Sequence, residues 1–161
     1  MRHGKSEPFA ASDHERALTD RGERSAADAG RHLVQTGNVP DFAIVSSAAR
    51  TQQTWSAVAE ASKSHAEVSV DEAVYSGSAD VVLDALRAVP VGVAVLMFVG
   101  HNPSAAIVAT QVDDGDGEAG AISAMLQGFP SGALVSFEVE VPWAELAAET
   151  GRVVDFHVGQ G

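Results

Sequence analysis

The sequence contains no cysteine and only one tyrosine in 161 residues. The absence of cysteine excludes disulfide bonds and metal sites built on thiolates. Long apolar runs are absent too, since the strongest, Val93 to Val99, is far shorter than the ~18 residues of a membrane span. The pattern that indicates a signal peptide, a basic start followed by an apolar segment, is absent from the sequence. We therefore expect a cytoplasmic protein that does not associate with membranes.

Positive charge is also scarce. The chain has 22 Asp and Glu residues against 10 Lys and Arg residues, which gives a formal net charge of -12 at pH 7. This balance argues against nucleic acid and anionic membrane surfaces as partners. A cluster of cations is conspicuous in such a chain, because a positive cleft in an acidic shell concentrates phosphate locally.

The length and the 45% hydrophobic content fit one domain over residues 1–161, and no repeat or linker-like segment divides it. Apolar periodicity and capping residues predict four helices. The first covers 20–36 and is capped by Asp20, and the second covers 50–63 with Trp55 in the core. The third has an apolar face of Val81, Val82, Ala85 and Leu86, and the fourth follows a cap at Asn102. Apolar runs predict strands at 42–45, 68–70, 93–99, 133–141 and 152–158.

The alternation of strands and helices predicts an α/β fold, a three-layer α/β/α sandwich with a mostly parallel central sheet. Residues 93–99 read as a central parallel strand, because the run is continuous and uncharged. The two C-terminal runs predict an antiparallel edge. The acidic stretch at residues 113–118 does not meet the EF-hand pattern, so we expect a solvated loop there.

The first residues, Met1-Arg2-His3-Gly4-Lys5, have the composition of a phosphate site. Neutral imidazole is a good nucleophile, and a neighbouring guanidinium holds phosphoryl oxygens in a bidentate fork. A glycine lets backbone N–H groups approach an anion closely. This combination suits phosphoryl transfer to His3.

Two later stretches place further polar groups just after predicted strands. Arg50 follows the run at 42–45 and opens a helical pattern, and His101 follows the run at 93–99. Strand ends that open onto helices are where open α/β sheets bind anions. We expect Arg50 and His101 to lie together there.

In chain order, Arg2-His3-Gly4, Ser46-x-x-x-Arg50-x-x-x-Thr54 and Gly100-His101-Asn102-Pro103 resemble the motifs of the histidine phosphatase superfamily, the phosphoglycerate-mutase-like group. The small SixA-type branch of phosphohistidine phosphatases fits best. Its pattern also takes in the segment from Arg16 to Gly22, Phe129-Pro130-Ser131-Gly132 and Trp143, so the resemblance covers nearly the whole chain.

The resemblance implies a metal-independent phosphatase in which His3 is the nucleophile that receives the phosphoryl group. His101 would donate hydrogen bonds to phosphoryl oxygens, and Arg2 and Arg50 would hold the developing charge. Arg16 is a further phosphate-binding candidate of the same type. Lys5, Asn102 and Ser46 are candidates for the mouth of the pocket, and the remaining histidines, His14, His32, His65 and His157, are given no role.

The substrate that the resemblance implies is phosphohistidine in a partner protein. A small phosphate ester, cleaved by a phosphomonoesterase, is one alternative, and a weakly catalytic phosphoprotein-binding module is another. We expect no cofactor and no metal, because no ligand-like spacing of carboxylates or a third histidine accompanies His3 and His101. Glu72 and Asp80 lie in the interval where other branches keep a general acid, but without the surrounding motif.

One feature departs from the family pattern. Related proteins place an apolar strand directly before Arg-His-Gly, whereas this sequence starts at Met1. An absent middle strand would leave backbone groups of its neighbours unpaired in the core. We therefore expect the natural chain to start upstream; the alternative is a domain without this strand.

Overall fold

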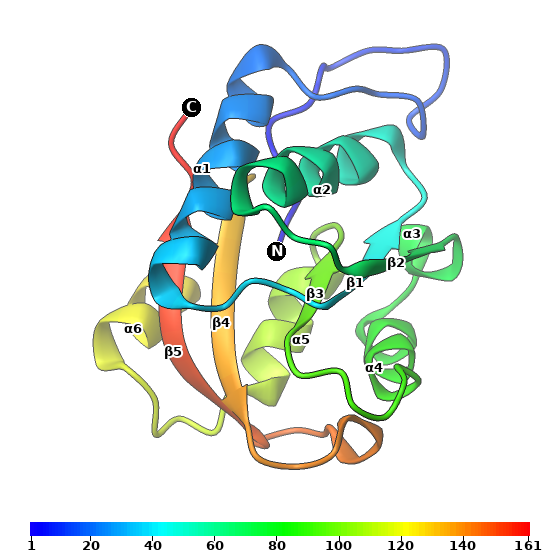
Figure 1. The fold of residues 1–161 in the computed structure, drawn as a ribbon. Coiled ribbons are helices and arrows are strands. Elements are labelled where there is room, and N and C mark those ends of the chain that lie inside the picture. Colours follow the sequence, from blue (N-terminus) through cyan, green and yellow to red (C-terminus); the bar gives the residue numbers. More distant parts are fainter.

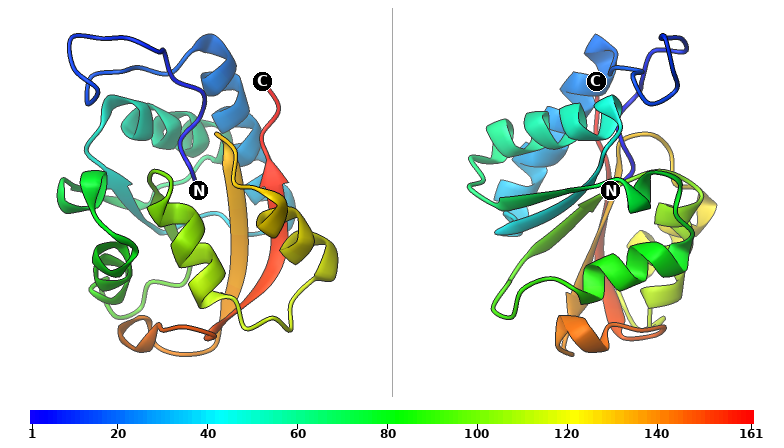
Figure 2. Two further views of the ribbon diagram at one scale, coloured as in Figure 1. Left: turned by 180° about the vertical axis from the view of Figure 1, so that it is seen from behind. Right: turned by 90° about the vertical axis from the view of Figure 1, so that its right-hand side faces the viewer.

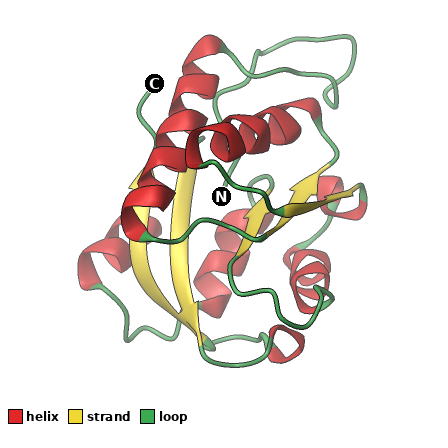
Figure 3. Cartoon of the chain, viewed as in Figure 1, coloured by secondary structure: helices red, strands yellow, loops and turns green.

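The structure is a computed structural model that describes residues 1–161, and helices and strands alternate along the chain (Figure 1) (Figure 3). The helices are α1 (Asp20–Thr36), α2 (Ala49–Ser62), α3 (Ala73–Ser76), α4 (Ala79–Arg87), α5 (Ser104–Val112), α6 (Ala119–Gln127) and the short 3-10 helix η1 (Trp143–Glu145). The strands are β1 (Phe42–Ser46), β2 (Glu67–Asp71), β3 (Leu96–Val99), β4 (Ala133–Val139) and β5 (Gly151–Val158).

The parallel part of the sheet has the order β2-β1-β3. Phe42 of β1 is in register with Glu67 of β2 and Leu96 of β3. All of β1 is buried, and its side chains alternate between two core clusters. Ala43 and Val45 pack with α1 and α2, whereas Phe42 and Ile44 pack with α4 and α5. The sheet therefore lies between two helical layers, as predicted (Figure 2).

β3 is shorter than its apolar run. We predicted a strand over 93–99, but β3 begins at Leu96. The carboxylate of Asp41 accepts hydrogen bonds from the backbone N–H groups of Ala94 and Val95, each at 3.0 Å. These groups are therefore satisfied by a side chain rather than by a neighbouring strand.

The C-terminal strands form the predicted antiparallel pair, with an irregularity between Ser136 and Phe137. They are a separate two-stranded sheet, which the first residues connect to β3. Gly100 N–H donates to the Met1 carbonyl at 3.1 Å, and Arg2 N–H donates to the Ala133 carbonyl at 2.9 Å. An apolar cavity of about 490 Å³ lies between β3 and β4, next to Met1. Met1 to His3 thus lies between the two sheets, and its backbone is held from both sides.

Several helix details differ from the sequence-based expectation. Thr19, not Asp20, is the N-cap of α1, and its hydroxyl accepts from Gly22 N–H. The side chain of Asn102 does not cap α5 but donates to the Phe129 carbonyl. Helix α4 buries Leu83, which was not among its predicted apolar residues, whereas Val81, which was among them, is exposed. None of the helices is both long and apolar enough to cross a bilayer.

Candidate active site

His3 is fixed by backbone contacts on both sides. Its N–H donates to the Gly100 carbonyl at 3.1 Å, and its carbonyl accepts from Gly132 N–H at 3.0 Å. The next residue, Gly4, has no room for a side chain, because a Cβ there would lie 2.6 Å from the Gly22 carbonyl oxygen. Gly4 N–H donates to the hydroxyl of Thr54 on α2 at 3.0 Å. The sheet and α2 together therefore set the position of His3.

The ring of His3 is oriented by its own backbone. His3 Nδ1 lies 2.7 Å from the Gly4 carbonyl oxygen. Because a carbonyl oxygen only accepts, Nδ1 carries the proton in this contact. The lone pair of neutral His3 is then on Nε2. His3 is almost completely buried, which lowers its pKa to about 4, with Arg50 acting in the same direction. The imidazole is thus neutral at physiological pH, with an unprotonated Nε2.

Arg50, in the first turn of α2, points its guanidinium at the same pocket. Its Nη1 donates to the backbone carbonyl of Asp13 at 2.6 Å and its Nη2 to the Asp13 carboxylate at 3.0 Å. The Tyr75 ring lies against it, 5.9 Å from the guanidinium carbon to the ring centroid. Arg50 is buried, with Nε left without a hydrogen-bond partner. It is a fixed cation with an unused donor.

His101 follows β3, and its ring centroid lies 5.2 Å from that of His3. Its Nε2 is 2.8 Å from the hydroxyl of Ser46, and its Nδ1 is 3.4 Å from Arg50 Nη2. Because the guanidinium only donates, Nδ1 accepts and Nε2 carries the proton. Burial lowers the pKa of His101 to about 3, and His3 and Arg50 add to the shift. His101 is therefore neutral as well.

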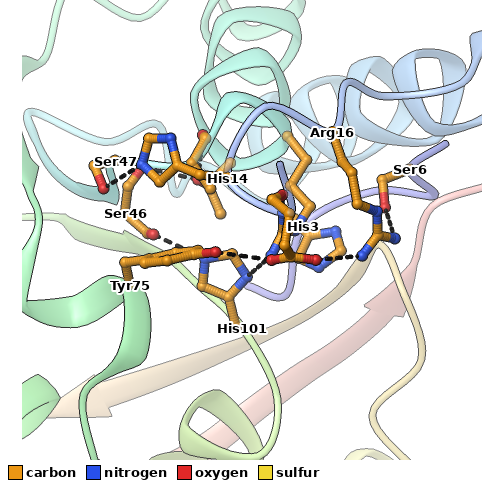
Figure 4. A network of polar contacts seen from close by, with 12 residues as sticks. His3, Ser6, His14, Arg16, Ser46, Ser47, Tyr75 and His101 are labelled. Carbon is orange, nitrogen blue, oxygen red and sulfur yellow. Dashed lines mark hydrogen bonds and ion pairs between the residues drawn. The ribbon is translucent and has the colours of Figure 1, made fainter. Parts of the chain in front are cut away.

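Arg2 and Arg16 complete the cationic wall. Arg2 donates from Nη1 to the Phe129 carbonyl at 3.0 Å, the same carbonyl that Asn102 contacts. Arg16 comes from the long loop before α1 and donates to Ser6, to the Glu7 carbonyl and to Asp13. The pocket has a volume of about 510 Å³ and is lined by Arg2, His3, Lys5, Ser6, Asp13, Arg16, Arg50, Tyr75, Ser76, His101, Asn102 and Ser131. Figure 4 shows Tyr75 and Arg16 on either side of His3 and His101.

Comparison with known proteins identifies this arrangement. Residues 1–75 match the family model of the histidine phosphatase superfamily (branch 1). An uncharacterized protein of Mycobacterium leprae is 30% identical over 165 residues, which cover 98% of this chain and 99% of that protein. A Nakamurella multipartitia structure assigned as phosphohistidine phosphatase SixA is 28% identical, with a TM-score of 0.87 over 99% of this chain and 93% of that one. The chain belongs to the histidine phosphatase superfamily.

Within the superfamily it is a phosphatase of the SixA-type branch, as the sequence resemblance indicated. Two further structures share the fold. A SixA assignment from Agrobacterium tumefaciens has a TM-score of 0.80 at 24% identity, covering 98% of this chain and 94% of that one. The protein histidine phosphatase SixA complexed with tungstate has a TM-score of 0.77 at 22% identity, with the same coverage of both chains.

The structure of this histidine phosphatase brings together the five residues singled out from its motifs, Arg2, His3, Arg16, Arg50 and His101. Lys5 and Asn102 also line the pocket, whereas Ser46 is fully buried behind His101 rather than at the mouth. No group of three or more His, Cys, Asp or Glu side chains is arranged as a metal site.

Asp13 and Tyr75 are among the lining residues that the motif analysis missed; the others are Ser6, Ser76 and Ser131. Tyr75 is on the short helix α3, and its hydroxyl donates to Asp13 at 2.8 Å. The only available signals were that Tyr75 is the one tyrosine of the chain and that Asp13 precedes Arg16 by three residues.

The two carboxylates considered as general acids lie outside the pocket. Glu72 is exposed and 3.7 Å from His14 Nε2, and Asp80 is exposed on α4. Neither lines the pocket. Asp13 does line it, but its hydrogen bonds from Arg16 and then Tyr75 hold its pKa well below the usual range. Asp13 is therefore ionised at physiological pH and has no proton to donate.

Proposed function

We propose that this protein is a metal-independent phosphatase that works through a phosphorylated His3 and removes phosphate from phosphohistidine in a partner protein. The observation that carries the proposal is the state of His3. Its Nδ1 is committed to the Gly4 carbonyl, and its Nε2 is the unprotonated nitrogen of a ring that lines a pocket with three arginines, Arg2, Arg16 and Arg50.

In the first step, the lone pair of His3 Nε2 forms a bond to phosphorus, and the bond from phosphorus to the leaving imidazole breaks. The leaving ring takes a proton from solvent. The equatorial oxygens gain charge in this step, and guanidinium groups fixed before the reaction stabilise that charge without reorganising. The proton on Nδ1, held by the Gly4 carbonyl, stabilises the imidazolium character that His3 gains.

In the second step, water attacks the phosphorus of phospho-His3. The bond to Nε2 breaks, the electron pair returns to that nitrogen, and inorganic phosphate leaves with the proton balance met by solvent. His101 starts this cycle with Nδ1 turned to Arg50 and Nε2 to Ser46. Its role as a donor to the phosphoryl group requires proton uptake at Nδ1, which an incoming dianion favours.

Phosphohistidine is favoured over other substrates by the pocket and by the relatives. The pocket offers no protonated carboxylic acid to an alkoxide leaving group. The similar structures assigned as SixA bear the name phosphohistidine phosphatase.

The test is trapping of the intermediate. Brief reaction with a radiolabelled phosphohistidine peptide should leave an acid-labile, base-stable phosphate on His3, located by mass spectrometry. His3→Ala should abolish label and turnover, whereas His65→Ala, which removes an exposed histidine, should keep both. Label on another residue, or turnover in His3→Ala above about a thousandth of wild type, would overturn the mechanism. Tight binding of the peptide without label or turnover would instead identify a binding module.

A further inference from the structure

The pocket already contains an anion that belongs to the protein. The carboxylate of Asp13 bridges two of the phosphate-binding candidates, with Oδ1 at 2.7 Å from Arg16 Nη1 and Oδ2 at 3.0 Å from Arg50 Nη2. The Tyr75 hydroxyl donates to the same Oδ2 at 2.8 Å. The two guanidinium groups are the kind of donor that a phosphoryl group would use.

We propose that Asp13 is a placeholder anion: its carboxylate takes up part of the phosphoryl position in the free enzyme, leaves when a phosphoryl group binds, and returns when phosphate departs. The proposal rests on the proposed function only in assuming that a phosphoryl group enters this pocket. It assigns Asp13 a role in controlling the affinity for substrate and product anions, and it makes no use of Asp13 in bond making.

The Asp13 side chain can leave without disturbing the arginines. Its backbone carbonyl accepts from Arg50 Nη1 at 2.6 Å, so Arg50 stays anchored when the carboxylate turns about the Cα–Cβ bond. The side chain is 55% exposed, and water can solvate it once it has turned. Residues 8–11, which precede it, take part in no hydrogen bond, so the loop yields at low cost.

The Asp13 carboxylate weakens the binding of all anions to the pocket by the same factor. Only the fraction of enzyme with the carboxylate turned away accepts a ligand, so the apparent dissociation constant is the intrinsic constant divided by that fraction. Weakly held anions are thereby excluded, while a phosphoryl group with several charge-assisted bonds still binds. The same factor lowers the occupancy of the pocket by product phosphate, and so it reduces product inhibition. In the empty pocket, Asp13 also offsets the repulsion between Arg16 and Arg50.

The experiment measures equilibrium binding of inorganic phosphate by calorimetry, with the full chain. Asp13→Asn removes the competing charge and should tighten phosphate binding roughly 3- to 30-fold. Tyr75→Phe keeps the ring beside Arg50 but removes the hydroxyl that holds Asp13, so it should tighten binding by a smaller factor. The matched control is Glu15→Gln, which removes the same charge from the same loop, where Glu15 contacts only Ser12. It should change the constant less than twofold.

Each other outcome contradicts the placeholder. Weaker phosphate binding in Asp13→Asn would make Asp13 a support for Arg50, and an unchanged constant would make it a bystander. Equal tightening in Asp13→Asn and Glu15→Gln would show that phosphate binding responds only to the long-range effect of the net charge. If Asp13→Asn fails to fold, as judged by circular dichroism, Tyr75→Phe decides alone, with no tightening counting against the proposal. Phosphate binding involves no turnover, so these results are independent of whether phospho-His3 is trapped.

Discussion

At the scale of single residues, burial makes histidine neutral in this pocket but leaves arginine charged. Desolvation lowers the pKa of His3 to about 4, so the ring is neutral and nucleophilic. Arg50 is at least as buried as His3 but keeps its charge, because arginine is not deprotonated in proteins. One desolvated site therefore holds a neutral imidazole beside a permanent cation, and the charge of Arg50 helps to keep His3 neutral.

The lowered pKa of His3 predicts a pH dependence of stability. An unfolded histidine has a pKa of ~6.5, so between that pH and about 4 the unfolded chain binds more protons than the folded one. The stability due to neutral His3 is complete above this window and is lost as the pH falls through it. His3→Gln should therefore lose about 2 kcal/mol less free energy of unfolding than wild type between pH ~7 and pH ~4.5. Urea titrations measure this, with exposed His65→Gln expected to behave as wild type.

Arg50 provides the second prediction at this scale. Arg50→Ala should raise KM for phosphate esters and lower kcat, with a combined loss on the order of 3 kcal/mol in kcat/KM. Arg50→Lys should recover only part, because one ammonium cannot replace the fork that contacts both the backbone and the carboxylate of Asp13. Arg31→Ala, an exposed arginine on α1, is the control. Full activity in the lysine variant would show that Arg50 is peripheral.

Which site residues could be predicted follows from how each is positioned. Arg50 and His101 follow apolar strands at short intervals, so the sequence carries their positions, and His3 was singled out by its neighbours Arg2 and Gly4. Asp13 and Tyr75 lie 62 positions apart, on an irregular loop and on a four-residue helix. Their meeting depends on the path of the folded chain, which no local period encodes.

At the scale of elements, α2 orients the catalytic segment through one buried hydroxyl. Thr54 accepts from Gly4 N–H at 3.0 Å and donates to the Arg50 carbonyl at 2.6 Å. The isosteric Thr54→Val would leave the buried Gly4 N–H without a partner, at a cost of about 1–3 kcal/mol in stability. We also expect kcat to fall, because Gly4 adjoins His3.

The matched control for Thr54→Val is Thr110→Val on α5. Thr110 donates to the Ala106 carbonyl one turn earlier, as Thr54 does to Arg50, but it is exposed and receives no N–H. Thermal unfolding and steady-state kinetics compare the two variants. Equal effects of both substitutions would show that the contact with Gly4 N–H is not important.

The elements themselves were largely predictable, and the exceptions have a common cause. Strand β1 and helices α1 and α2 follow apolar patterns that local sequence carries. Strand β3 begins later than its apolar run, where the backbone N–H groups of Ala94 and Val95 donate to the side chain of Asp41. Asp41 is more than fifty positions away in the sequence. Helix α3 is only Ala73–Ser76, too short for a 3.6-residue period to be visible. Long-range side-chain contacts and very short elements therefore escape sequence reasoning.

At the scale of the whole molecule, a chain with a formal net charge of -12 gathers Arg2, Arg16 and Arg50 at one pocket. The division into two sheets was not predictable, because it depends on how Met1 to His3 pair with β3 and β4. The meeting of Arg50 and His101 was predictable, because parallel strands end at one edge of a sheet, whereas Arg2 and Arg16 were expected there from the N-terminal motif and the resemblance to the family.

This charge distribution predicts how the activity responds to metal removal. In the proposed mechanism, the three guanidinium groups that line the pocket supply the positive charge that a divalent cation supplies in many other phosphatases. We therefore expect kcat and KM to be unchanged after dialysis against excess EDTA. A loss of activity that added magnesium or manganese restores would contradict the mechanism.

The last prediction concerns the leaving group and follows from the position of the carboxylates. Transfer from a serine or sugar oxygen benefits from a positioned acid by roughly 100- to 10,000-fold. In this protein Glu72 and Asp80 lie outside the pocket, and Asp13 inside it is held ionised. An imidazole leaving group has a conjugate acid of pKa ~6.5, so solvent can supply its proton.

We therefore expect kcat/KM to be at least about 100-fold higher for phosphohistidine than for phosphoserine peptides of the same sequence. Among aryl phosphates the rate should rise as the phenol becomes more acidic, because a better leaving group needs less protonation. Glu72→Gln and Asp80→Asn should leave both results unchanged, since neither side chain reaches the pocket. Similar rates for alkyl phosphates, aryl phosphates and phosphohistidine would require a proton donor in the pocket, and a fall in the phosphoserine rate in either variant would identify it.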